Sequence, residues 1–166
     1  MEGVFKQRRR EESFTLIELI ITIAIAGIVL LSLSLALREN VRTLKQQKDM
    51  QSAAMLAEDL MGEIRAKNFA DPQSPTSFGR EESLPRRNFD DVDDYAGWTS
   101  SPPQTIEGAP MTSYTGFWYR VTVTNVVATN FDSPQPPGAT GFKRIIVVVS
   151  NSQVVVSNAS VVSEYD

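Results

Sequence analysis

An uninterrupted apolar run near the N-terminus is the feature that most limits how this chain can fold. Between residues 14 and 37 the only ionisable side chain is Glu18. A helix of about 24 residues at ~1.5 Å per residue is ~36 Å long, which exceeds the ~30 Å hydrocarbon core of a bilayer. We therefore expect residues 14–37 to form a transmembrane helix with one carboxylate near its entrance.

The residues before this run are polar and strongly charged. Their basic side chains are Lys6, Arg8, Arg9 and Arg10. The segment is too polar to be the apolar region of a secretory signal, so we expect the apolar run to be retained. Basic residues at this end favour a cytoplasmic N-terminus, although further basic residues follow between positions 38 and 48.

The helical pattern continues past the apolar run. Residues 38–69 contain no proline and one glycine, Gly62. Apolar residues recur there at spacings of three and four, which marks one helix face. The residues on this face are Met50, Ala53, Ala54, Ala57, Leu60, Met61 and Ile64. We expect one continuous helix of about 55 residues, whose amphipathic outer half, residues 38–69, packs on another element.

Residues 70–113 are rich in proline and polar residues and are expected to form a long loop region. The stretch "NFDDVDDYAGW", residues 88–98, places Phe89, Val92 and Tyr95 three residues apart. This spacing predicts a short helical turn that docks on the core, with the neighbouring aspartates facing water.

From residue 114 onward the apolar pattern changes to a period of two. Phe117, Tyr119, Val121 and Val123 alternate with more polar neighbours, and residues 142–150 and 153–163 are rich in β-branched side chains. We expect residues 114–166 to form three antiparallel strands, with residues 130–141 as a connecting loop. The predicted fold class is α+β, a long N-terminal helix packed on a small antiparallel sheet.

Composition excludes several classes of function. The chain has no cysteine and no histidine, which excludes disulfide frameworks, thiol nucleophiles, zinc fingers and histidine-based triads. The formal net charge of −4 argues against a nucleic-acid partner. No phosphate loop, nucleophile elbow or activated carboxylate pair is recognisable. We expect neither an enzyme nor a cofactor.

The acidic run Asp90, Asp91, Asp93 and Asp94 offers clustered oxygen ligands of the kind that calcium prefers. Its spacing departs from an EF-hand loop, because Ala96 stands where a glycine is required when counting from Asp91. Helix capping and a solvated face are the favoured explanations, so calcium is kept only as a weaker alternative and no metal is predicted.

The start of the apolar run also resembles a known family. A basic leader, then "SFTLIEL" at residues 13–19, then an apolar run containing Gly27, is similar to the N-terminal segment of the type IV pilin and type II secretion pseudopilin superfamily. The resemblance implies that a prepilin peptidase removes residues 1–13 by cutting between Ser13 and Phe14. It also implies N-methylation of Phe14 and a role for Glu18 in assembly.

Partners and location follow from the same resemblance. It implies contacts with other pilin or pseudopilin subunits through the N-terminal helix, with the prepilin peptidase and with an inner-membrane assembly platform. The protein would cross the inner membrane once, with a periplasmic C-terminal head, and then enter a pilus or pseudopilus. Two features of this sequence depart from the common pattern. Ser13 replaces the usual glycine, and no proline precedes Pro72.

Three further stretches resemble minor pilins of the mannose-sensitive haemagglutinin (MSHA) type, the MshD-like group. They are "LAEDLMGEIRAKNF", "RRNFDDVDDYAGW" and "YRVTVTNV". This resemblance implies a low-copy subunit that initiates, caps or modifies a pilus. The alternatives are a minor pseudopilin of a type II secretion system, or a membrane-anchored periplasmic binding domain in which Glu18 only reaches toward the membrane interface.

Overall fold

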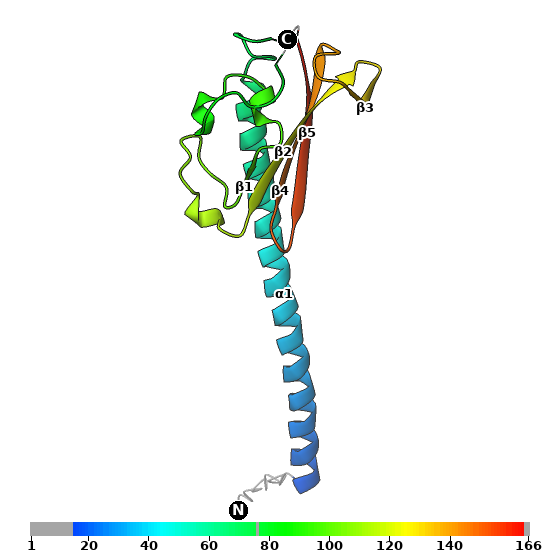
Figure 1. Ribbon diagram of the computed structural model, residues 1–166. Helices are drawn as coiled ribbons and strands as arrows, with labels where there is room; N and C mark the ends of the chain where they lie inside the picture. The colour runs from blue at the N-terminus through cyan, green and yellow to red at the C-terminus, as the bar shows by residue number, and fades with distance from the viewer. Residues whose placement is uncertain (1–14, 76, 165–166) are drawn as a thin grey trace, which may run out of the picture. The chain divides into compact units, whose positions relative to one another are not determined.

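The computed structural model describes residues 15–75 and 77–164. The chain divides into two compact units, Met1–Leu44 and Lys45–Asp166. Helix α1 (Leu16–Arg65) runs through the boundary between them. The second unit, here called the head, contains the end of this helix, a loop region and a β-sheet (Figure 1).

Helix α1 has 50 residues and ends at Arg65 rather than near residue 69 as predicted. After Arg65 the backbone hydrogen bonds span three residues instead of four. The amides of Ala66 and Lys67 donate to carbonyls three residues earlier, at 3.3 and 3.1 Å. Asn68 then forms an isolated bridge with Asp91. The chain leaves the helix because this bridge requires an extended backbone.

The buried face of α1 agrees with the predicted stripe except at its edges. The buried residues are Ala53, Leu56, Ala57, Leu60, Met61 and Ile64. Met50 is 52% exposed and Ala54 is exposed, whereas Leu56, which was not predicted, is buried. The stripe is therefore rotated slightly from the predicted one and includes small alanines that allow close packing.

The sheet has five antiparallel strands rather than three. The strands are β1 (Thr99–Ser100), β2 (Trp118–Val127), β3 (Asn130–Gln135), β4 (Phe142–Ser150) and β5 (Val155–Ser163). Their order is β1-β2-β4-β5, and β3 also pairs with β2. Strand β4 pairs with both of its long neighbours, for example Val147 with Val121 of β2 and with Asn158 of β5.

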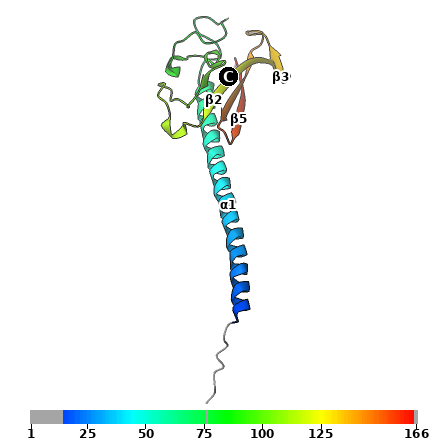
Figure 2. The same ribbon diagram turned by 60° about the horizontal axis from the view of Figure 1, so that its bottom comes forward.

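Strand β3 contradicts the prediction of a connecting loop over its residues. It pairs with the end of β2 through Gln135, Pro134 and Asn130, with a register shift between Val126 and Val127 of β2. Proline lacks an amide hydrogen, but it is tolerated on an edge strand, and a proline-containing sequence is a weak strand signal. Figure 2 shows β3 at the margin of the sheet, clear of β5.

The core of the head lies between the stripe of α1, the sheet and the loop region. Strand β2 buries the alternating residues Tyr119, Val121 and Val123, and β4 buries Ile145, Val147 and Val149. The loop region contributes Phe89, Val92, Tyr95 and Trp98 to the same cluster. This arrangement confirms the predicted α+β fold class, one long N-terminal helix packed on a small antiparallel sheet.

The predicted docking turn is present as a 3₁₀ helix, η2 (Asp93–Tyr95). Two turns of the same kind and length, η1 (Arg86–Asn88) and η3 (Thr112–Tyr114), flank it in the sequence. The rings of Phe89 and Tyr95 meet edge to face, with centroids 5.0 Å apart. Aromatic packing of this kind fixes the loop region on the core.

Candidate functional site

Thr15 caps the first turn of helix α1. Its carbonyl accepts a hydrogen bond from the Leu19 amide at 3.2 Å, and its hydroxyl oxygen accepts one from the Glu18 amide at 3.3 Å. Thr15 therefore acts as the N-cap residue. Thr15 and Glu18 have the T-x-x-E spacing of a capping box, so the start of this helix is also encoded locally in the sequence.

Glu18 lies in this first turn with an exposed side chain. An acid is favoured there, because the free amides at a helix N-terminus carry partial positive charge. Within residues 15–75 and 77–164, none of the ion pairs includes Glu18. A cationic partner for this carboxylate has to come from outside the described part of the chain.

Large apolar side chains surround Glu18 along the first half of α1, and each of them is more than half exposed. They are Leu16, Ile17, Leu19, Ile20, Ile21, Ile23, Ile25, Ile28, Val29, Leu30, Leu31, Leu33, Leu35 and Leu37. By length and composition, α1 is suited to crossing a membrane. Water is a costly environment for so much apolar surface, whereas bilayer hydrocarbon is not.

The hydroxyl groups in the apolar segment are satisfied within the helix itself. Thr22, Ser32 and Ser34 each donate to the backbone carbonyl four residues earlier, at distances between 2.7 and 2.9 Å. A bilayer core supplies no hydrogen-bond partners, so these bonds allow the hydroxyls to enter hydrocarbon. The Glu18 carboxylate cannot be satisfied in this way, because it has no hydrogen to donate to a backbone carbonyl when it is ionised.

The sequence of this segment matches a known family model. Residues 8–34 match the prokaryotic N-terminal methylation motif. The chain carries a pilin-type N-terminal motif. This match supports the type IV pilin and pseudopilin superfamily, whose members are structural subunits. Neither a curated protein nor a solved structure matches the chain.

The pilin-type motif implies assembly with other pilin subunits and cleavage by a prepilin peptidase. Together with the apolar helix it suggests an inner-membrane anchor. Of the predicted site residues in this segment, Ser13 and Phe14 lie outside the described residues, and Glu18 lies one turn into α1. The α+β head agrees with the pilin-like architecture.

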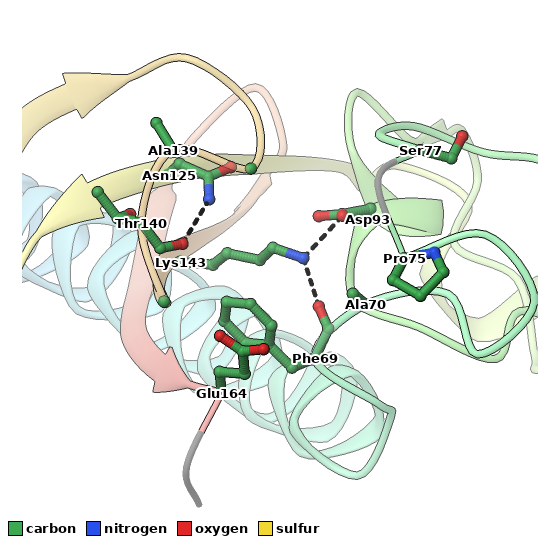
Figure 3. A pocket seen from close by; sticks show the side chains of 12 residues that line it. Phe69, Ala70, Pro75, Ser77, Asp93, Asn125, Ala139, Thr140, Lys143 and Glu164 are labelled. Atoms are coloured by element: carbon green, nitrogen blue, oxygen red, sulfur yellow. Dashed lines mark hydrogen bonds and ion pairs between the residues drawn. The ribbon is translucent and has the colours of Figure 1, made fainter.

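The head contains a cavity of about 260 Å³ lined by the chain after α1, by η2 and by β4 (Figure 3). The Lys143 ammonium donates to a carboxylate oxygen of Asp93 at 2.7 Å and to the carbonyl of Phe69. It also lies 4.1 Å from the centroid of the Phe69 ring. Both charged side chains are at most 4% exposed. The ammonium thus joins three segments that are distant in sequence.

Burial raises the pKa of the Asp93 carboxyl, and the Lys143 ammonium opposes that shift. The pair serves as a buried clamp that would be costly to separate. Sequence reasoning missed Lys143, although a signal was present: in β4, Lys143 has the same parity as Ile145, Val147 and Val149, which all face the core. A period of two therefore places this lysine inside.

The acidic run does not face water, so this part of the prediction was wrong. Asp91, Asp93 and Asp94 are 1%, 3% and 0% exposed. The reason is that the preceding loop folds over the run: the Glu81 amide reaches Asp94 at 3.4 Å, and Asp71 lies beside Asp90 and Asp91. The four aspartates also separate, since Asp93 pairs with Lys143 and the other three face the acids of the loop.

A second buried charge network connects α1 to the loop region. One nitrogen of the Arg86 guanidinium donates to Glu63 at 2.8 Å, and the other donates to the carbonyl of Gln104 at 2.7 Å. The Tyr95 hydroxyl donates to the second oxygen of Glu63 at 2.7 Å. Burial, assisted by Glu63, raises the pKa of Tyr95 well above its usual range. The Arg86 guanidinium also stacks 4.7 Å from the ring centroid of Trp98.

Proposed function

We propose that this protein is a minor pilin-like subunit of a type IV pilus of the MSHA kind. In this proposal a prepilin peptidase removes residues 1–13 by cutting between Ser13 and Phe14, and the new amine of Phe14 is methylated. Residues 14–37 form the membrane and assembly helix, 38–69 its amphipathic continuation, 70–113 the loop region and 114–166 the sheet of the head. The head faces the periplasm before assembly.

The observation that carries this proposal is the match of residues 8–34 to the methylation motif. The helix there has in its apolar surface one carboxylate, Glu18, that forms no ion pair with residues 15–75 or 77–164. A charged carboxylate near the centre of a membrane helix costs about 2.5–3.5 kcal/mol, and less near the end. Cleavage before Phe14 would create an ammonium four residues from Glu18. Pairing between neighbouring subunits would fix the axial register of their helices.

A minor pseudopilin of a type II secretion system is the second candidate. The same motif serves both groups, and α1 contains no proline, a residue that kinks helices. Since a proline in this segment belongs to the common pilin pattern, its absence favours a pseudopilin or minor pilin over a bulk pilus subunit. Mechanical shearing of cells separates the two candidates: we expect the protein in sheared surface fibres, whereas a pseudopilin would remain with the cell envelope.

Processing can be tested by mass spectrometry of the N-terminal peptide of membrane-extracted protein. We expect a chain that begins at Phe14 and carries one added methyl group. Ser13→Gly restores the residue that is usual in the family and should increase the processed fraction. A wild-type chain that begins at Met1 would favour an ordinary membrane anchor and contradict the proposal.

The role of Glu18 can be separated from helix capping by comparing Glu18→Gln with Glu18→Ala. Glutamine also serves at the third position of a capping box, but it removes the charge. We expect both variants to insert into the membrane and to enter fibres roughly tenfold less or worse, since each ~1.4 kcal/mol of lost pairing is a factor of ten. The measurement is quantitative immunoblotting of sheared fibres against the membrane fraction.

Glu39→Gln is the matched control, because Glu39 is exposed on the same helix beyond the apolar run. This variant should enter fibres as the wild type does. Normal assembly of Glu18→Gln, with failure of Glu18→Ala, would assign Glu18 to capping and refute the charge-pairing role.

A further inference from the structure

Six carboxylates converge in the loop region next to η2. They form three overlapping groups, and within each group the ligand oxygens lie within 4.8 Å of one another. The groups are Asp71, Asp90 and Asp91; Glu81, Asp91 and Asp94; and Glu82, Asp90 and Asp94. We call these six residues the acidic loop cluster. Asp90, Asp91 and Asp94 each belong to two groups and form its centre.

The centre of the acidic loop cluster is inside the protein. Of its three residues, Asp91 and Asp94 are 1% and 0% exposed and Asp90 is half-buried, and the adjoining Asp71 is 5% exposed. Ionised carboxylates are costly to bury, and mutual repulsion increases that cost when they lie together. A fold that buries several of them at one place needs a source of positive charge there.

Backbone amides provide part of that charge. Both oxygens of Asp94 accept amide hydrogen bonds, one from Glu81 at 3.4 Å and the other from Asp90 and Asp91 at 3.0 and 3.4 Å. One oxygen of Asp91 accepts bonds from the amides of Asp93 and Asp94. These bonds hold the carboxylates in place and orient them toward one another.

Other oxygens of the acidic loop cluster lack any donor. Among the described residues, one buried carboxylate oxygen each of Glu82, Asp90 and Asp91 has no hydrogen-bond partner. Across residues 15–75 and 77–164, no ion pair includes a member of the cluster. Two lysines bond to residues next to the cluster in the chain: Lys143 pairs with Asp93 and Lys67 donates to the Phe89 carbonyl.

Repulsion between these acids is visible in their pKa values. Burial raises the pKa of the Asp91 carboxyl, and the neighbouring carboxyl of Asp94 raises that of Glu82. The carboxylates of the acidic loop cluster therefore disfavour one another's ionised form.

We propose that the acidic loop cluster binds one Ca²⁺ ion. Calcium takes six to eight oxygen ligands at about 2.3–2.6 Å and accepts irregular geometry, whereas Mg²⁺ requires a near-ideal octahedron and retains water. The ligands come from three separated stretches of the loop region, around residues 71, 81–82 and 90–94. The bound ion would fasten these stretches together. This inference does not depend on pilus assembly.

The test uses the full-length chain in detergent micelles after treatment with a chelator and removal of the chelator. Ca²⁺ alone is titrated by calorimetry, and unfolding is followed by near-UV circular dichroism. We expect saturable binding of one ion per chain and a rise in Tm of about 5 °C or more at saturation. Mg²⁺ should bind at least about tenfold more weakly.

Two variants locate the site. Asp91→Asn keeps an oxygen for the backbone bonds but removes the charge, and Asp71→Asn changes a ligand that is outside the 90–94 turn. Each should weaken Ca²⁺ binding about tenfold or more and reduce the rise in Tm. Asp132→Asn is the control, since the Asp132 side chain is 90% exposed and far along the chain.

The results decide the proposal in either direction. Absence of Ca²⁺ binding by the folded wild type at millimolar concentration would overturn it. So would unchanged affinity in both Asp91→Asn and Asp71→Asn. If Asp91→Asn fails to fold, as judged by its circular dichroism spectrum, Asp71→Asn alone decides the outcome.

Discussion

Arg86 illustrates how a single charged residue can hold a loop on a helix. Its guanidinium is 5% exposed and bonds to Glu63, which is 18% exposed. The same residue bonds a backbone carbonyl and covers the Trp98 ring. A planar guanidinium can make these contacts at once, whereas an ammonium cannot. Removing it would leave Glu63 partly buried without its cation.

We predict that Arg86→Ala lowers the free energy of unfolding by about 3 kcal/mol, because the loss of one partner strands a largely buried charge. Arg86→Lys should recover less than half of this. Arg87→Ala is the adjacent control: Arg87 and Glu107 are both 59% exposed, and an exposed pair contributes at most about 1 kcal/mol. Urea unfolding of the full chain in micelles measures all three. Equal losses for Arg86→Ala and Arg87→Ala would refute the argument.

At the residue scale, a sequence singles out a residue that carries its own context. Glu18 stands out because it is the one ionisable side chain between residues 14 and 37, and its role in assembly stays a prediction. Arg86 and Lys143 do not stand out, because their partners lie between 18 and 74 residues away in the chain. Local spacing can place Lys143 on the inner face of β4, but it cannot identify Asp93 as the acid that it meets.

At the scale of elements, periodicity is informative when the element is long. The helical face of α1, apart from its edges, and the inner face of β2 were predicted from spacings of three to four and of two. Strand β4 was predicted from its β-branched composition, without an inner face. Strands β1 and β3 were missed because β1 has 2 residues and β3 contains a proline. Short or edge strands are defined by their partner, here β2, and not by their own sequence.

The packing of α1 on the sheet predicts different results at two neighbouring alanines. Ala57 is fully buried, so Ala57→Leu should overpack the interface and lower the free energy of unfolding by about 1–3 kcal/mol. Ala54→Leu is the control, because Ala54 is exposed and its effect should stay within about 0.5 kcal/mol. Thermal unfolding of both variants tests the observed stripe. A larger loss of stability for Ala54→Leu than for Ala57→Leu would contradict it.

At the scale of the whole molecule, the head is held together by contacts between distant segments. Lys143 on β4 connects to η2 through Asp93 and, through Phe69, to the chain that follows α1. The fold class was predictable because it depends on the order of long elements. The path of residues 70–113 was predictable only at the turn that Phe89, Val92 and Tyr95 dock on the core. Elsewhere it depends on buried charges whose partners are distant in the sequence.

A double-variant experiment measures this clamp. Lys143→Met should lower the free energy of unfolding by about 3–5 kcal/mol, because Asp93 is left buried and charged. Adding Asp93→Asn to Lys143→Met should recover part of that loss, since the stranded charge is removed. Urea unfolding of the single and double variants gives the coupling energy. Simple addition of the two losses would show that the pair is not coupled.

The distance along the chain between the α1 stripe and its partner strand has a consequence for biosynthesis. Ile64 and Ile145 belong to one core cluster, yet about 80 residues separate them. At roughly 5–20 residues per second, the ribosome needs roughly 4–16 s to reach β4 after it has made the stripe. For that interval the nascent chain has a complete apolar helix face but lacks β4, the central strand that pairs with both β2 and β5.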